Sequence, residues 1–339
     1  MLTAGFYLNV KNPNQSDGLY MKENASPDKN KELKQNASQQ GVSELNRPTE
    51  GLSTLIGKQV DVLVSSYGEP NRKDFSSYGY EWWIYDDVKG YMQVGVENGE
   101  IVTLYAIGEK VNIAPFKIGQ SVEDLFSKVI FDAGVNFTYE ETSYRFEMSE
   151  DEMNTRPLVK LGDIYVQLLI DKFTGELSSV RFFNEKTLVT QRPYELVYRG
   201  ELLENEPLSD DSWRRIEEGS KQQIFDITNI MRRRYHVKPL KWDEATAEVA
   251  FLHSKDMYDS NTFTHNSKLF GELSDRLKTA NIQYQIAGEN IAANYMDAPA
   301  VMEGWLNSEG HRDSLLNDKY THIGVGVFHK HYTQDFIQK

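Results

Sequence analysis

The segment W-L-N-S-E-G-H-R-D-S-L-L-N, Trp305 to Asn317, places a carboxylate, an imidazole and a guanidinium within four consecutive residues. A helix start precedes it, because Asp297 can cap a helix and a proline suits the first turn. Gly310 is typical of a helix end. We therefore expect Glu309 and His311 to flank a helix terminus, from which their side chains can project into a neighbouring groove.

Further motifs lie on both sides of this segment. Upstream are K-W-D-E-A-T-A-E-V-A-F-L-H-S-K-D-M (241–257), F-T-H (263–265) and A-G-E-N-I-A (287–292), and downstream are Y-T-H-I-G-V-G-V (320–327) and H-Y-T-Q-D-F (331–336). Apolar spacing predicts helices from Asp211 to Tyr235 and from Asp243 to about Tyr258. His253 lies near the apolar face of the second helix, so we interpret it as a packed histidine.

The last two motifs predict a β-hairpin with His331 on its second strand. Because strand side chains alternate, Thr333 should face the same way as His331. Around Glu289, Gly288 is expected to adopt a backbone conformation closed to other residues, and Asn290 is expected to tie the chain with its amide.

These motifs, in this order, resemble those of the CAP superfamily, the cysteine-rich secretory, antigen 5 and pathogenesis-related proteins, in a bacterial branch without cysteine. The resemblance covers about residues 218–337 and implies a three-layer α-β-α sandwich. It also implies a surface cleft lined by two histidines and two glutamates. Carried over to this chain, the set is His265, Glu289, Glu309 and His331. Glu309 follows Trp305 by four residues where the family pattern has three, so His311 is a candidate for its place.

A cleft of this composition allows several kinds of chemistry. Imidazoles and carboxylates can bind a divalent metal, act as general acid and base, or hydrogen-bond one another. We expect His265 and His331 as the ligands if zinc is bound, and we expect Asn290, His311 and Arg312 to contribute to ligand binding. The hydrolytic and nucleotide-binding patterns H-E-x-x-H, G-x-S-x-G and G-x-x-x-x-G-K-[ST] are absent from the sequence.

Three functions remain open at this stage. We favour a secreted or surface-tethered binding protein without catalytic activity, whose cleft takes a small molecule or lipid and which can also meet a cell-envelope protein. The alternative is a metal-dependent hydrolase acting on peptide or cell-wall material, with Glu289 as general base. The third is a structural protein of the envelope or spore coat.

A second domain is expected before these motifs. I-G-K-Q-V at 56–60 reappears as I-G-Q-S-V at 118–122, and each copy is followed by a short helix-like segment and strand-like sequence. This pattern predicts an α+β domain of two repeated helix-plus-sheet units over residues 51–195. It resembles the N-terminal module that accompanies CAP domains in some Gram-positive bacteria. The aromatic run at 78–85 is interpreted as strand residues that pack a sheet.

The remaining segments complete a four-part organisation. Residues 1–50 are polar apart from an apolar start and are interpreted as a flexible tether, with a possible remnant of a signal or anchor. Residues 196–210 are a linker, and 211–339 are the CAP-like domain. The net charge of −14 argues against nucleic-acid binding, and no apolar run is long enough to span a bilayer. The absence of cysteine excludes disulfides and thiolate metal sites.

Overall fold

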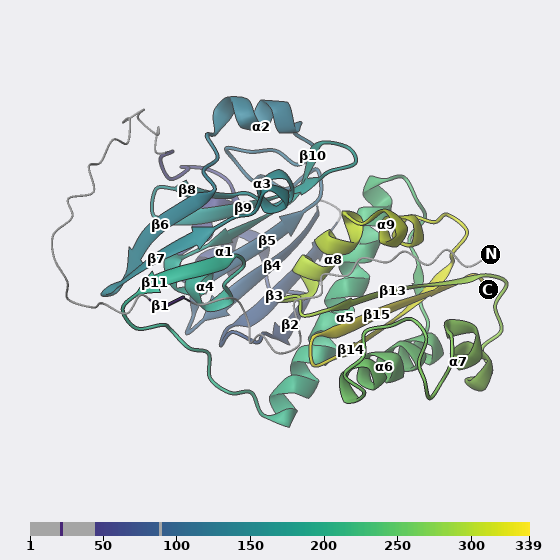
Figure 1. The fold of residues 1–339 in the computed structure, drawn as a ribbon. Coiled ribbons are helices and arrows are strands. Elements are labelled where there is room, and N and C mark those ends of the chain that lie inside the picture. The colour runs from purple at the N-terminus through teal and green to yellow at the C-terminus, as the bar shows by residue number, and fades with distance from the viewer. Residues whose placement is uncertain (1–20, 23–44, 88–89) are drawn as a thin grey trace.

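The computed structural model describes residues 21–22, 45–87 and 90–339, and these residues form an α+β protein (Figure 1). The expected α+β class is therefore confirmed. Most of the expected tether, residues 1–50, lies outside the described residues. Residues 21–22 form the short strand β1 (Met21–Lys22), which pairs with β11 (Glu195–Arg199).

The N-terminal part is built on a seven-stranded sheet in the order β2-β3-β4-β5-β10-β9-β8. All neighbouring strands in it are antiparallel. Its strands are β2 (Arg72–Phe75), β3 (Glu81–Asp87), β4 (Gly90–Glu97), β5 (Glu100–Ile107), β8 (Leu158–Leu161), β9 (Ile164–Asp171) and β10 (Glu176–Phe183). The aromatic run therefore does form a strand, as expected from its composition.

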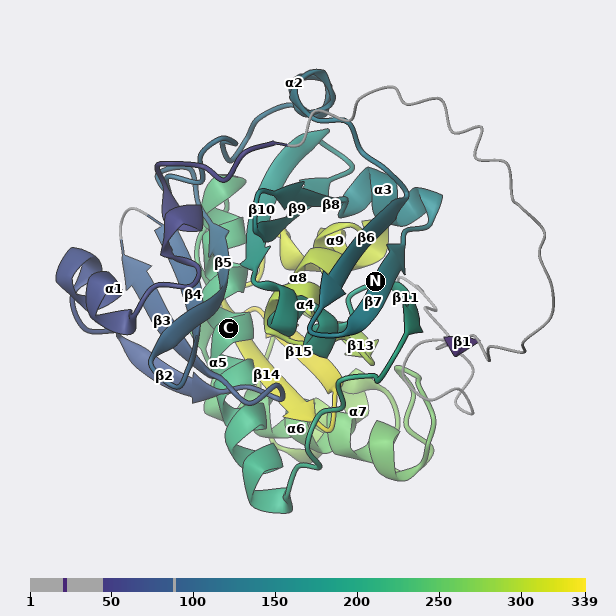
Figure 2. The ribbon, with the colours of Figure 1, turned by 90° about the vertical axis from the view of Figure 1, so that its left-hand side faces the viewer.

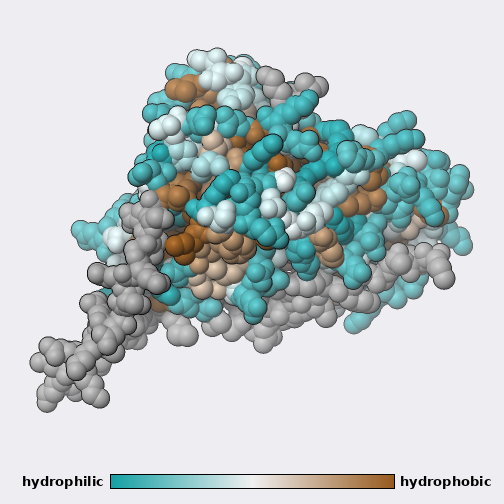
Figure 3. Space-filling view, turned by 90° about the horizontal axis from the view of Figure 1, so that it is seen from above, coloured by the Kyte–Doolittle hydropathy of each residue, from teal (hydrophilic) through white to brown (hydrophobic). Residues whose placement is uncertain are grey.

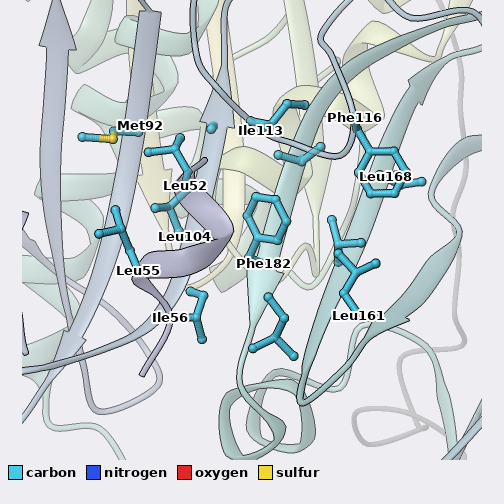
Figure 4. Packing of buried hydrophobic residues seen from close by; sticks show 14 of the residues in the cluster. Leu52, Leu55, Ile56, Met92, Leu104, Ile113, Phe116, Leu161, Leu168 and Phe182 are labelled. Carbon is cyan, nitrogen blue, oxygen red and sulfur yellow. The ribbon is translucent and has the colours of Figure 1, made fainter. Parts of the chain in front are cut away.

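One face of this sheet is covered by short helical elements. The 3₁₀ helix η1 (Leu52–Leu55) places Leu52 and Leu55 against Met92 and Leu104 of the central strands, and Phe182 joins the same apolar cluster (Figure 4). Helices α1 (Val60–Tyr67) and α2 (Val122–Lys128) each follow one I-G-x-x-V segment.

The two I-G-x-x-V segments make matching backbone contacts. Gly57 N donates to Ile101 O at 2.7 Å, and Gly119 N donates to Leu177 O at 2.9 Å. Each glycine has a φ of 79°, a conformation that favours glycine. The segments thus join the final strand of their own unit in the same way, while a repeat of two whole units stays a prediction.

A smaller sheet, β1-β11-β7-β6, extends the N-terminal part. It contains β6 (Gly134–Tyr139) and β7 (Thr142–Glu147). In the sequence, helix α3 (Glu150–Thr155) follows β7, and helix α4 (Glu185–Gln191) precedes β11. An aromatic cluster that includes Phe137, Phe146 and Tyr194 fills its interior.

The C-terminal part is a four-stranded sheet in the order β12-β14-β15-β13, enclosed by helices (Figure 2). Its strands are β12 (Lys241–Trp242), β13 (Ala287–Ala293), β14 (His322–Phe328) and β15 (His331–Ile337). Helix α6 (Glu244–Asp259) covers one face, followed by α7 (Leu273–Thr279). Helices α5 (Asp210–Arg234), α8 (Ala298–Leu306) and α9 (Glu309–Leu315) lie on the other side. The two long helices and the β14–β15 hairpin agree with the sequence predictions.

One of the hydrophobic clusters has members from both parts. The second face of the seven-stranded sheet packs against α5 and α8, so α5 runs between the two sheets (Figure 1). Tyr80, Trp82 and Tyr105 of the N-terminal sheet belong to the same cluster as Ile227 and Trp305 of the C-terminal part. Seen from above, the molecular surface is mainly hydrophilic, with separate small hydrophobic patches (Figure 3).

The helix boundary near Gly310 differs from the prediction. Asp297 caps α8 by accepting a hydrogen bond from Ala300 N, as expected, but α8 already ends at Leu306. Gly310 lies in the first turn of α9 rather than at a helix end. Glu309 and His311 are therefore on the same short helix.

Candidate functional site

Glu289 is the centre of a cluster of polar side chains on the C-terminal sheet. Strand β13 carries it, and its side chain is only 4% exposed. His265 Nδ1 donates a hydrogen bond to Glu289 Oε1 at 2.7 Å, and the His265 side chain is 22% exposed. The predicted pair of His265 and Glu289 is thus brought together, with the imidazole at the surface and the carboxylate behind it.

Arg276 is the cationic partner of Glu289. Its guanidinium, from α7, forms an ion pair with Glu289 Oε2 and also donates to His265 O at 2.9 Å and to Gly271 O at 3.2 Å. Burial alone raises the pKa of Glu289, but the hydrogen bond from His265 and the charge of Arg276 lower it below its usual range. Glu289 is therefore a carboxylate at neutral pH.

Two further buried groups face Glu289. His253 Nε2 of α6 lies 3.8 Å from Glu289 Oε2, and burial lowers the pKa of His253 to about 4, so its ring is neutral at pH 7. Asp335 lies directly opposite Glu289 in the β13–β15 pairing. Burial and the charge of Glu289 raise the pKa of Asp335 well above its usual range. Asp335 therefore holds its proton more strongly than an ordinary aspartic acid does, because it is buried beside the Glu289 carboxylate.

His311 lies near enough to His265 for the charge of that ring to act on it. It is buried on α9, and burial together with the charge of His265 lowers its pKa to about 4. Its backbone carbonyl accepts a hydrogen bond from Asn290 Nδ2 at 3.1 Å. Asn290 does tie two segments with its amide, but it does so from within β13.

Of the other predicted residues, the structure places Arg312 and His331 away from this cluster. Glu309 is exposed at the start of α9. Arg312 forms an ion pair with Asp171 of the N-terminal part at 3.0 Å, so it belongs to the contact between the two parts. His331 lies opposite Ala293, four residues along β15 from Asp335, a separation of about 13 Å. Its Nδ1 faces His329 O, and its ring packs edge-on against Tyr258.

Zinc held by His265 and His331 stays a prediction, and His331 lies about 13 Å along β15 from Asp335, the residue opposite Glu289. Within the residues that the structure describes, no group of three or more His, Asp or Glu side chains is arranged to hold a metal ion. His265 Nδ1 engages one oxygen of Glu289 and Arg276 engages the other, so this carboxylate is not an open metal ligand. No step through a metal is derived from these residues.

The loop after His265 adds an apolar element to the site. Leu269 is 77% exposed and Phe270 is 52% exposed, although both are large hydrophobic residues. Ser267 Oγ accepts hydrogen bonds from both of their backbone N–H groups, at 3.1 and 2.9 Å. The loop is therefore held by its own hydrogen bonds while it presents to solvent two apolar side chains, four and five residues after His265 in the chain.

The sequence did not predict that Arg276 and Asp335 lie beside Glu289, nor that His253 approaches the same carboxylate. A signal existed for Asp335, because it lies two residues beyond Thr333 and strand alternation puts both on one face. No local pattern distinguishes Arg276 from the other basic residues of the chain.

Comparison with known proteins identifies a family for each of the two parts of the chain. The model of the CAP-associated N-terminal domain matches residues 56–194, and that of the cysteine-rich secretory protein family matches residues 225–338. An uncharacterised membrane protein of Bacillus subtilis, YlbC, is 50% identical over 305 residues, which cover 90% of this chain and 88% of that protein.

Two solved structures are similar over most of their length. One is an extracellular protein of Bacillus anthracis that contains an SCP domain, with 45% identity, a TM-score of 0.82, and coverage of 87% of this chain and 98% of that one. The other is a cysteine-rich secretory protein of Staphylococcus aureus, with 30% identity, a TM-score of 0.77, and coverage of 88% and 98%. The resemblance inferred from the motifs is confirmed.

Proposed function

We propose that this chain, which belongs to the cysteine-rich secretory protein (CAP) family, is a binding protein that works outside the cytoplasm and takes its ligand at the Glu289 cluster. The observation that carries the proposal is the arrangement of His265. Its ring is partly exposed, while the partners that hold it, Glu289 and Arg276, are each only 4% exposed. A surface imidazole fixed by buried charges is preorganised to contact a ligand.

The chemistry of the surroundings supports a ligand with two unlike parts. A polar group would meet the imidazole of His265, and an apolar group would lie on Leu269 and Phe270 beside it. Isolated exposed apolar residues are common on protein surfaces, but an ordered pair next to a polar cluster indicates a contact site. We therefore favour an amphipathic small molecule or a lipid, with a cell-envelope protein as the other class of partner.

The location outside the cytoplasm rests on the relatives. One similar structure is that of an extracellular protein, and one similar sequence is that of a membrane protein. In the part of the chain that the structure describes, every helix is too short or too polar to cross a bilayer. We propose association with the outer cell surface.

Hydrolysis is the second candidate, because a carboxylate that holds an imidazole is a known arrangement for general-base catalysis. For the metal-dependent form, the described residues contain no group of three His, Asp or Glu side chains arranged to hold a metal ion. Glu289 is also a poor general base here, because its pKa is lowered and both its oxygens are engaged. Binding therefore agrees with the geometry better than hydrolysis does.

The test is capture of the ligand on the full-length chain purified without a tag. Native mass spectrometry and solvent extraction should find a bound amphipathic molecule in the wild type and much less of it in His265→Ala. His331→Ala is the matched control, since His331 lies away from the cluster and should keep wild-type occupancy. If both variants carry as much ligand as the wild type, the Glu289 cluster is not the binding site.

A further inference from the structure

We propose that Arg276 is the positioning residue of this site, and that it fixes where the His265 ring stands relative to the apolar loop tip. The inference rests on the proposed function, because Arg276 acts through His265 and not on the ligand. It goes beyond the pair of His265 and Glu289, because one buried guanidinium on α7 contacts both β13 and the loop of residues 265–271.

The contacts of Arg276 show how one side chain reaches three segments. Its Nη1 donates to the backbone carbonyls of His265 and Gly271, which stand at the two ends of the loop. Its Nη2 binds the carboxylate of Glu289 on β13. Glu289 in turn accepts from the His265 ring, so Arg276 holds His265 both through its main chain and through its side chain.

The loop's own hydrogen bonds do not make this connection. Ser267 and Gly271 exchange backbone hydrogen bonds at 3.0 and 2.9 Å, and Ser267 Oγ caps the turn between them. These bonds give the loop its shape, whereas those of Arg276 attach that shape to β13. The distance between the imidazole and the exposed side chains of Leu269 and Phe270 is therefore set by Arg276.

Arginine suits this task where lysine does not. A guanidinium carries five N–H donors in a planar fork and can serve several acceptors in fixed directions, while an ammonium is a single point on a flexible stem. Arg276→Lys keeps a positive charge beside Glu289 but cannot span both carbonyls and the carboxylate. This substitution separates positioning from simple charge neutralisation.

The experiment measures the His265 ring in the full-length chain and needs no ligand. Proton–nitrogen NMR spectra report the tautomer of each imidazole, and mass spectrometry of peptides reports the rate at which diethyl pyrocarbonate modifies each histidine. In Arg276→Lys we expect the hydrogen-bonded Nδ1–H signal of His265 to be lost and the modification rate of His265 to change at least threefold. The rate of His331 should stay constant in the same sample.

Two control variants complete the design. Lys278→Gln removes an exposed cation from the same helix and should leave the spectra of His265 unchanged. Ser267→Ala loosens the turn but keeps every contact of Arg276, so it should retain the Nδ1–H signal. If Arg276→Lys melts at a lower temperature with His265 unchanged, the arginine is only an ion-pair partner and the inference is wrong. A loss of the signal in Ser267→Ala as large as in Arg276→Lys would also overturn it, because the loop would then set the ring by itself.

These outcomes are independent of the proposed function. Failure to find a ligand in the wild type contradicts the binding proposal, but it does not alter the tautomer of His265. Conversely, an unchanged His265 ring in Arg276→Lys removes the positioning role and leaves the binding proposal in place.

Discussion

At the scale of single residues, Gly288 is held by packing and not by backbone conformation. Its φ is not among the positive values that favour glycine, contrary to the sequence-based expectation. A Cβ at this position would overlap the hydroxyl oxygen of Tyr320 and lie 3.0 Å from its Cζ. The neighbour of Glu289 is therefore a glycine because Tyr320 occupies the space of a side chain.

The overlap with Tyr320 predicts that a side chain at position 288 destabilises the fold and that a smaller residue at position 320 restores stability. Gly288→Ala should lower the free energy of unfolding by roughly 1–3 kcal/mol, the usual cost of overpacking. Adding Tyr320→Phe removes the overlapping oxygen and should restore more than half of that loss. Urea unfolding of the two single variants and the double variant measures the coupling. Strict additivity would mean that the cost at position 288 comes from the backbone after all.

The sequence predicted two residues of the site, but it did not predict the buried charges that contact them. F-T-H and G-E-N identified His265 and Glu289 from the family pattern alone. Arg276 could not be found in this way, because its role depends on a helix that folds back onto β13 from thirteen positions earlier in the chain. The positions of such charges are set by tertiary packing, which leaves no local signature.

At the scale of elements, the register of β13 against β15 decides which residues meet. Sequence alternation correctly predicted that His331 and Thr333 lie on a strand, but it does not say which residue pairs with Glu289. The pairing puts Asp335 there and leaves His331 opposite Ala293. Turn geometry and burial set the register between two strands. The pattern of a single strand therefore predicts which face a side chain lies on, but it does not predict which residue pairs with it on the neighbouring strand.

Helix α6 shows a similar dependence on close packing. Gly324 and Gly326 of β14 have no room for a Cβ, because the backbone of α6 at Ala247 and Phe251 lies against them. The spacing G-V-G in the Y-T-H-I-G-V-G-V motif thus lets a helix approach the sheet at backbone distance. This approach carries His253 to within 3.8 Å of Glu289.

For the molecule as a whole, the two parts were predicted as separate domains, and one hydrophobic cluster has members from both. Each sequence pattern describes one sheet or helix and cannot tell which faces meet. A signal was present in Y-G-Y-E-W-W-I-Y, since alternate residues on both sides of that strand are large and aromatic. Trp82 faces the C-terminal helices, and Trp83 faces the opposite cluster.

The independent folding of residues 211–339 stays a prediction, and the shared cluster adds an expected loss of stability in the isolated fragment. Residues 211–339 contain every strand of the C-terminal sheet, so limited proteolysis should release them as a folded fragment. The isolated fragment exposes apolar surface of α5 and α8 that is buried in the full chain, so we expect it to melt at a lower temperature. Circular dichroism on the purified fragment tests this. A fragment without a cooperative transition would place the boundary elsewhere.

The contact between the two parts also contains a titratable group. Glu303 of α8 is 5% exposed, and its Oε1 accepts hydrogen bonds from Ser179 at 2.6 Å and Tyr105 at 3.1 Å, both from the N-terminal sheet. Burial raises its pKa from 4.5 to about 7. The unfolded chain releases this proton near pH 4.5, while the folded chain keeps it to about pH 7.

Between these two pH values the folded state binds more protons, so this group lowers the free energy of unfolding as the pH rises through the window. The full effect above pH 7 is roughly 3 kcal/mol, from about 1.4 kcal/mol per pKa unit. Glu303→Gln keeps an oxygen for Ser179 and Tyr105 but cannot ionise. We expect it to match the wild type near pH 5 and to exceed it by 1–3 kcal/mol at pH 8 (order of magnitude).

Urea unfolding of the full chain at several pH values measures that difference. The other buried groups, such as His253 and His311, titrate equally in both proteins, so their contributions cancel in the comparison. A constant difference from pH 5 to pH 8 would mean that Glu303 is already ionised in the folded protein at pH 5. In that case Arg234, whose charge acts on Glu303, compensates it more strongly than burial penalises it.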